Sequence, residues 1–87
     1  KVKVGGLVYK INLVDKISET NCSGITKPET LTIEIEKANE RYMEAVFLHE
    51  ILHAVNMEWP EERVEATASQ LYQILVDNKG IFDYGKE

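Results

Sequence analysis

The sequence predicts an α+β fold in a single domain, residues 1–87, with a small N-terminal antiparallel sheet packed on a C-terminal antiparallel pair of helices. Three observations predict this order. Short β-prone runs precede residue 37, apolar residues recur at helical spacing after residue 39, and the polar stretch between the strands has no period. Eighty-seven residues are near the lower limit for a domain with one apolar core, so we expect one domain.

The N-terminal part of the chain predicts strands. Residues 2–14 contain two β-prone runs on either side of Gly5-Gly6, a dipeptide that favours a tight hairpin turn. Residues 31–36, LTIEIE, alternate between apolar and polar side chains, as a half-buried strand does. Residues 15–30 collect Ser, Thr, Asn, Gly and Pro without a sustained period, and they therefore predict a loop.

The C-terminal part predicts two helices. Asn39 is the expected N-cap of a helix that begins near Glu40 and ends near Asn56. A second helix is expected from the segment 59–62, WPEE, where proline and acidic residues favour a first turn, to the segment 78–80, NKG. Because so few residues separate the two helices, we expect an antiparallel αα-hairpin.

The first predicted helix contains the sequence HEILH at residues 49–53, which includes both histidines of the chain. Positions i and i+4 share one helix face, so His49 and His53 can bind one metal ion. Glu50 lies about 100° further round the helix, too far to chelate with the imidazoles but suitably placed to hold a water that the metal polarises. The pattern is the HExxH signature of zinc hydrolases, in which Glu50 would be the general base.

The residues around the motif favour metal binding. Residues 45–55, AVFLHEILHAV, are apolar on every side except for the three motif residues, and a helix that is apolar all round is normally buried. A buried carboxylate without a partner is costly, and a divalent cation would compensate its charge. We therefore expect the cofactor Zn²⁺.

The third metal ligand is less well determined. Zinc hydrolases use three protein ligands and leave one position to water. No third histidine exists, so the third ligand must be a carboxylate or Cys22. Glu65 is preferred because it borders the apolar stripe of the second helix, opposite the last turn of the first. Glu62 and Cys22 remain alternatives, since spacing does not fix the rotation of a helix. Glu61 and Glu62 are otherwise interpreted as a solvated first turn.

Charge and composition limit the classes of binding partner and the cellular compartment that we expect. A net charge of −5, with scattered Lys and Arg, argues against nucleic acid and membrane surfaces as partners. No apolar run approaches the roughly 20 residues that cross a bilayer. The single cysteine, Cys22, excludes an internal disulfide and fits a reducing compartment. We expect a cytoplasmic protein that acts on an intracellular protein or peptide.

The motifs resemble those of a known family. With HEILH in one predicted helix, VEATASQLYQILVDN in the next and TIEIE before them, the chain resembles a minimal gluzincin. It is most similar to small HExxH proteins encoded by bacteriophages and prophages of Gram-positive bacteria, distant relatives of the ImmA/IrrE metallopeptidases. The resemblance covers residues 30–79.

This resemblance implies a zincin-like domain. His49 and His53 would be zinc ligands, Glu50 the base, and Glu65, which precedes Ala66 as in the family, the third ligand. The gluzincin pattern also implies an antiparallel edge strand over the metal cleft. Residues 31–36 would serve as this strand, and a peptide could pair with it by β-augmentation.

Two functions from different classes follow. The first is a zinc-dependent metallopeptidase, in which Glu50 takes a proton from the attacking water and returns it to the leaving amine. Tyr9, Tyr72 and Tyr84 are candidate donors to the oxyanion in this reaction. The alternative is a non-catalytic, zinc-stabilised module that binds a protein, with Cys22 closing the metal shell. Glu50 favours the enzyme, because a purely structural site does not need a base.

Overall fold

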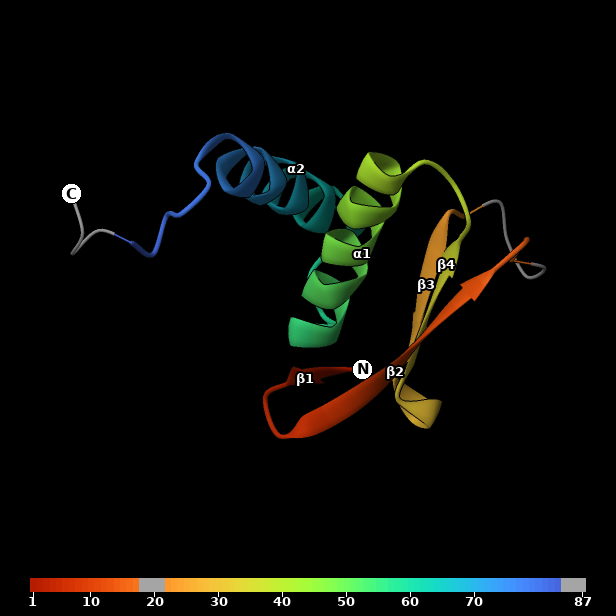
Figure 1. Ribbon diagram of the computed structural model, residues 1–87. Coiled ribbons are helices and arrows are strands. Elements are labelled where there is room, and N and C mark those ends of the chain that lie inside the picture. Colours follow the sequence, from red (N-terminus) through yellow and green to blue (C-terminus); the bar gives the residue numbers. More distant parts are fainter. Residues whose placement is uncertain (18–21, 84–87) are drawn as a thin grey trace.

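A computed structural model of the chain describes residues 1–17 and 22–83. Within these residues the elements are β1 (Val2–Val4), β2 (Leu7–Val14), β3 (Gly24–Lys27), the 3₁₀ turn η1 (Pro28–Thr30), β4 (Thr32–Glu36), α1 (Glu40–Val55) and α2 (Glu61–Asp77). The strands form one sheet, α1 packs on it, and α2 packs on α1 on the side away from the sheet (Figure 1). The predicted α+β class is confirmed.

The N-terminal hairpin has the predicted form. β1 and β2 pair antiparallel, with Val4 opposite Leu7 across the Gly5-Gly6 turn. Gly5 has a φ of +62°, in the left-handed region that glycine enters at little cost because it lacks a Cβ. The left-handed backbone conformation at this position of the turn therefore explains why Gly5 is a glycine.

The pairing of the other strands corrects the prediction. The strand order is β1-β2-β4-β3, with β4 parallel to β2 and antiparallel to β3. The sheet is therefore mixed, and residues 31–36, expected to be an edge strand, lie inside it with a neighbour on each side. The alternation of these residues indicates which face is buried, but it carries no information about neighbours. A parallel crossover is possible because the connection between Val14 and Thr32 exceeds the dozen or so residues it needs.

β3 lies in the segment predicted to be a loop. Its sequence, GITK, is short and begins with glycine, so neither alternation nor strand propensity indicates it. Its extended form depends on pairing with β4, where Gly24 lies opposite Ile35 and Thr26 opposite Ile33. β3 is the last strand in the order and packs beside α1.

The core lies between the sheet and α1. Ile33 and Ile35 are buried there together with Tyr9, which confirms the face predicted from the alternation of residues 31–36. Partly buried side chains of α1 complete the cluster, namely Met43, Val46, Phe47, Ile51 and Ala54. The apolar run around the HExxH motif thus packs against the sheet, as its composition predicts.

The helices begin and end close to their predicted bounds. Oδ1 of Asn39 accepts a hydrogen bond from the backbone nitrogen of Tyr42 at 2.9 Å, so Asn39 caps α1 as expected. Pro60 is the N-cap residue of α2, with Glu61 and Glu62 in the first turn. In the described part of the chain, neither helix is long and apolar enough to span a membrane.

The two helices run in opposite directions along their contact. His53, near the end of α1, contacts Glu61 at the start of α2, whereas Glu44 contacts Tyr72 further along. The expected antiparallel hairpin is confirmed. Because the helices meet in this order, each turn of the motif faces a defined turn of α2.

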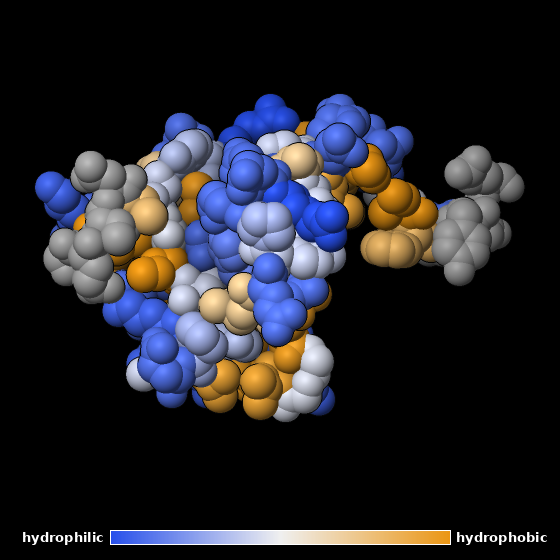
Figure 2. Space-filling view, turned by 180° about the vertical axis from the view of Figure 1, so that it is seen from behind, coloured by the Kyte–Doolittle hydropathy of each residue, from blue (hydrophilic) through white to orange (hydrophobic). Residues whose placement is uncertain are grey.

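Apolar side chains on the surface are spread over several elements. The large exposed ones include Leu7 and Val8 of β2, and Ile81 and Phe82 beyond α2. Seen from behind, the surface is largely hydrophilic, with separate apolar areas at the lower edge and beside the grey C-terminal residues (Figure 2). Separate apolar residues of this kind are ordinary for a protein surface.

Gly24 marks the closest approach of β3 to α1. A Cβ at this position would lie 2.6 Å from Cγ1 of Val46 and 3.0 Å from Cγ of Glu50. We expect Gly24→Ala to destabilise the fold by about 1–3 kcal/mol, the usual cost of overpacking a core. Gly6→Ala is the matched control, because a Cβ there meets no atom within 4 Å. Urea unfolding of both variants tests this, and equal midpoints would contradict the close contact.

Candidate metal centre

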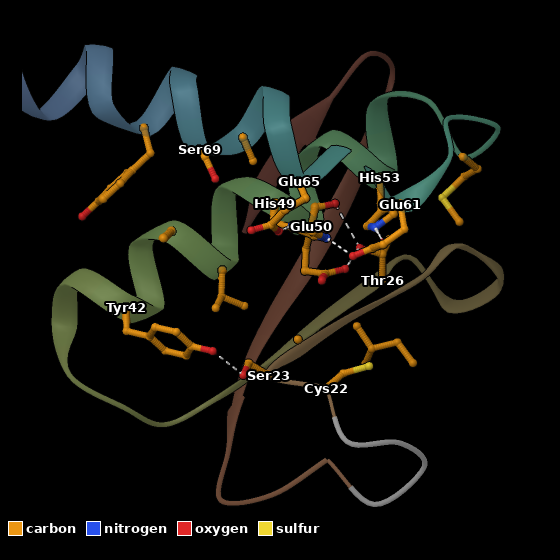
Figure 3. A pocket seen from close by; sticks show the side chains of 17 residues that line it. Cys22, Ser23, Thr26, Tyr42, His49, Glu50, His53, Glu61, Glu65 and Ser69 are labelled. Atoms are coloured by element: carbon orange, nitrogen blue, oxygen red, sulfur yellow. Dashed lines mark hydrogen bonds and ion pairs between the residues drawn. The ribbon is translucent and has the colours of Figure 1, made fainter. Parts of the chain in front are cut away.

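The candidate site is a pocket where β3, α1 and α2 meet. It encloses about 660 Å³ and is lined by side chains from all three elements. Figure 3 shows the motif residues of α1 between β3 on one side and the first turns of α2 on the other. The pocket therefore depends on the sheet and on the helical hairpin together.

His49 and His53 direct their rings into this pocket. The ring centroids are 4.9 Å apart and the rings meet edge to face. Both Nε2 atoms contact the same carboxylate of α2: Nε2 of His49 lies 2.9 Å from Oε2 of Glu61, and Nε2 of His53 lies 2.9 Å from Oε1. The two imidazoles thus converge, as the i, i+4 spacing predicts.

Glu65 also contacts the motif, but at the other ring nitrogen of His49. Its Oε1 lies 2.8 Å from Nδ1 of His49. The structure therefore brings the expected Glu65 to the histidines. Glu61 is solvent-exposed in the first turn of α2, as expected, but its carboxylate also contacts both histidines, which the sequence did not predict. The signal for Glu61 was its i, i+4 spacing from Glu65, which matches that of the facing histidines.

The other two candidate ligands are not part of this arrangement. Glu62 is exposed and does not line the pocket. Cys22 lines the pocket but is exposed, and it belongs to neither His/Glu group that could hold a metal in the described residues. Neither residue is brought to the histidines by the fold.

Glu50 faces β3 and is buried, with 6 % of its surface exposed. Oγ1 of Thr26 lies 2.7 Å from Oε1 of Glu50 and 3.0 Å from its backbone oxygen. Gly24 lies beside the same side chain. Sequence reasoning missed Gly24 and Thr26 because it did not detect β3.

Two groups of side chains have the spacing to hold a metal ion. One is His49, Glu50 and His53, and the other is His49, Glu61 and Glu65; within each group the ligand atoms lie within 4.8 Å of one another. Ligand atoms around a tetrahedral zinc ion are about 3.4 Å apart, so small shifts would suffice. Imidazole nitrogen and carboxylate oxygen are donors that zinc accepts. The residues therefore fit a divalent metal ion.

The tyrosines differ in their relation to the pocket. Tyr72 lines it, and its hydroxyl donates a hydrogen bond to Oε1 of Glu44 at 2.8 Å. This bond to the Glu44 carboxylate raises the pKa of Tyr72 above its ordinary value. Tyr9 is a packed core residue outside the pocket lining and is excluded as an oxyanion donor. Tyr84 lies outside the described residues.

Comparisons of the chain with protein-family models, with curated proteins and with solved structures give no match. The likeness to zinc hydrolases therefore rests on the HExxH-like group His49, Glu50 and His53 within a small α+β fold.

We expect the protein to bind one divalent metal ion per chain and to gain stability from it. The candidate ligands come from two helices, so the ion should bind the paired helices and not the unfolded chain, which adds roughly 2.7 kcal/mol at a hundred times its Kd. Removal by a chelator should lower the melting temperature by several degrees. Elemental analysis after titration with Zn²⁺ gives the stoichiometry, and thermal scans give the shift. The variant His53→Ala, which lacks one ligand, should show neither effect. A stoichiometry near zero for the wild type would contradict the metal site.

Proposed function

We propose that the protein is a zinc-dependent metallopeptidase that hydrolyses peptide bonds with Glu50 as the general base. The main support is the position of Glu50, a buried carboxylate beside two converging imidazoles. A structural zinc site is closed by four protein ligands and needs no additional carboxylate. A hydrolytic site keeps a general base next to an open coordination position.

The residues divide the work as follows. His49 and His53 would hold the ion through Nε2, together with a carboxylate of α2. An ion held there would supply Lewis-acid chemistry: it would polarise the peptide carbonyl and lower the pKa of a bound water to about 7. Glu50 accepts a proton through Oε2, because Oε1 is engaged by Thr26, and then transfers it to the leaving amine.

The contacts of His49 suggest which α2 carboxylate is the third ligand. Nδ1 and Nε2 point to different sides of an imidazole ring, so a carboxylate at Nδ1 cannot share an ion with Nε2. Glu61 contacts Nε2 of both histidines, whereas Glu65 contacts Nδ1. We therefore infer that Glu61 is the ligand and that Glu65 accepts a hydrogen bond from Nδ1 of His49 and orients the ring, in place of the ligand role expected for Glu65.

Glutamine variants of α2 test this division. We expect Glu65→Gln to weaken Zn²⁺ binding by about tenfold, as loss of an orienting partner does, and Glu61→Gln to weaken it further because a ligand is lost. Glu62→Gln is the control and should bind normally, since Glu62 does not line the pocket. Isothermal titration measures the three affinities. A larger loss in Glu65→Gln than in Glu61→Gln would restore Glu65 as the ligand.

The outer edge of β3, the last strand of the sheet among the described residues, is the proposed place for a peptide substrate. β4, expected to offer this edge, is paired on both sides, whereas β3 ends the sheet and its residues line the pocket. An extended peptide that added to β3 would pass beside Glu50 and the histidines. Ala45 and Ala68 leave room for its side chains in the pocket.

We expect Glu50→Gln to abolish hydrolysis while leaving Zn²⁺ affinity nearly unchanged. Loss of a general base lowers the rate by about 10²–10⁴-fold, and glutamine keeps the shape of the side chain. A mixture of unfolded proteins can serve as substrate, with new amino termini detected by mass spectrometry. Glu58→Gln, an exposed residue outside the pocket, is the matched control.

The outcomes separate the two functions. If Glu50→Gln cleaves as fast as the wild type, Glu50 is not the base. If the zinc-loaded wild type cleaves no peptide bond, the alternative of a non-catalytic, zinc-stabilised binding module is favoured.

A further inference from the structure

Helix geometry predicts that Glu50 lies too far round α1 to chelate with the imidazoles, but the structure corrects this and places Glu50 close enough to the histidines to act as a metal ligand itself. His49, Glu50 and His53 form one of the two groups whose ligand atoms lie within 4.8 Å of one another. A base must instead stay beside the metal position and leave it open, because a fourth protein ligand would close the site. Some feature of the fold has to decide between these two roles.

The hydroxyl of Thr26 meets Oε1 of Glu50. The distance is 2.7 Å, which is the short length typical of a hydroxyl that donates to a charged carboxylate. The same hydroxyl lies 3.0 Å from the backbone oxygen of Glu50, so its single proton is directed at this residue in either case. In the part of the chain that the structure describes, Thr26 is the hydrogen-bond donor to the Glu50 carboxylate.

The strand that carries Thr26 is held firmly. Thr26 pairs with Ile33, a fully buried residue of β4, and its β-branched side chain restricts rotation at χ1. Gly24, two residues earlier and hence on the same side of β3, leaves space for the carboxylate: a Cβ there would lie 3.2 Å from Oε2 of Glu50. Gly24 and Thr26 together form the binding position of the Glu50 side chain on β3: Gly24 leaves the space and Thr26 supplies the hydrogen bond.

We propose that Thr26 is a positioning residue that holds Glu50 on the β3 side of the pocket and so keeps it a base instead of a fourth metal ligand. This inference rests on the proposed metal site. Without the hydroxyl, the buried carboxylate loses its hydrogen-bond donor, and the nearest compensation for its charge is the metal ion. Glu50 then coordinates the ion and closes the open position.

The experiment uses the protein loaded with Co²⁺, whose visible spectrum reports the ligand set, and acetohydroxamate as a probe of the open position. For Thr26→Val we expect a changed spectrum, acetohydroxamate binding weakened about tenfold or more, and metal affinity equal to or higher than that of the wild type. Thr26→Ser keeps the hydroxyl and should restore the wild-type spectrum. Thr26→Ala repeats the test should valine disturb the strand.

The double variant Thr26→Val/Glu50→Gln identifies the cause. If Glu50 is the group that closes the site, the double variant has the spectrum of Glu50→Gln alone, because glutamine is a poor ligand. A wild-type spectrum and wild-type acetohydroxamate binding in folded Thr26→Val and Thr26→Ala would overturn the proposal. Failure of the wild type to bind Co²⁺ or Zn²⁺ would instead overturn the metal site on which it rests.

Discussion

The burial of the Glu50 carboxylate in the contact between α1 and the sheet constrains the rest of the site. An ionised carboxylate moved out of water costs several kcal/mol unless it gains a partner. The structure supplies that partner from Thr26 and supplies the space from Gly24, both on a strand that is far from the motif in sequence. The pairing of β3 with β4 therefore also places Thr26 and Gly24 where they compensate the burial of the Glu50 carboxylate.

The acidic residues of α2 are under a different constraint. The Glu61 and Glu65 side chains are 67 % and 66 % exposed, so water can solvate them whether or not a metal is bound. Their contacts with the histidines are consequently worth little as contributions to folding. They matter for the proposed metal site, because they contact His49 at both ring nitrogens and so orient the ring.

Much of the fold follows from local patterns in the sequence. Gly5-Gly6 predicts a turn, Asn39 predicts the start of α1, and the spacing of His49 and His53 predicts a shared face, because each depends on neighbouring residues only. β3 could not be predicted, since four residues beginning with glycine become a strand only when β4 lies beside them. The inner position of β4 was missed for the same reason.

In the candidate site, too, the features that depend on neighbouring residues could be predicted, and those that depend on contacts between distant segments could not. Its histidines could be predicted because the motif fixes them within one helix. The choice between Glu61 and Glu65 could not, because it depends on the rotation of α2 about its axis, which short spacing does not determine. Thr26 was missed because its contact with Glu50 exists only in the folded chain.

The separation in sequence of the contacting residues has a consequence for folding. His53 and Glu61 are eight residues apart, and the hairpin that joins them closes quickly because short loops cost little entropy. Thr26 and Glu50 are 24 residues apart, on a strand that must first add to the sheet. Contacts between residues that are far apart in the sequence form more slowly as a rule. The helical hairpin can thus bring the candidate metal ligands together early, while Glu50 meets Thr26 only when β3 has joined the sheet. On the proposed function, a partly folded chain would therefore bind an ion before the proposed base is in position.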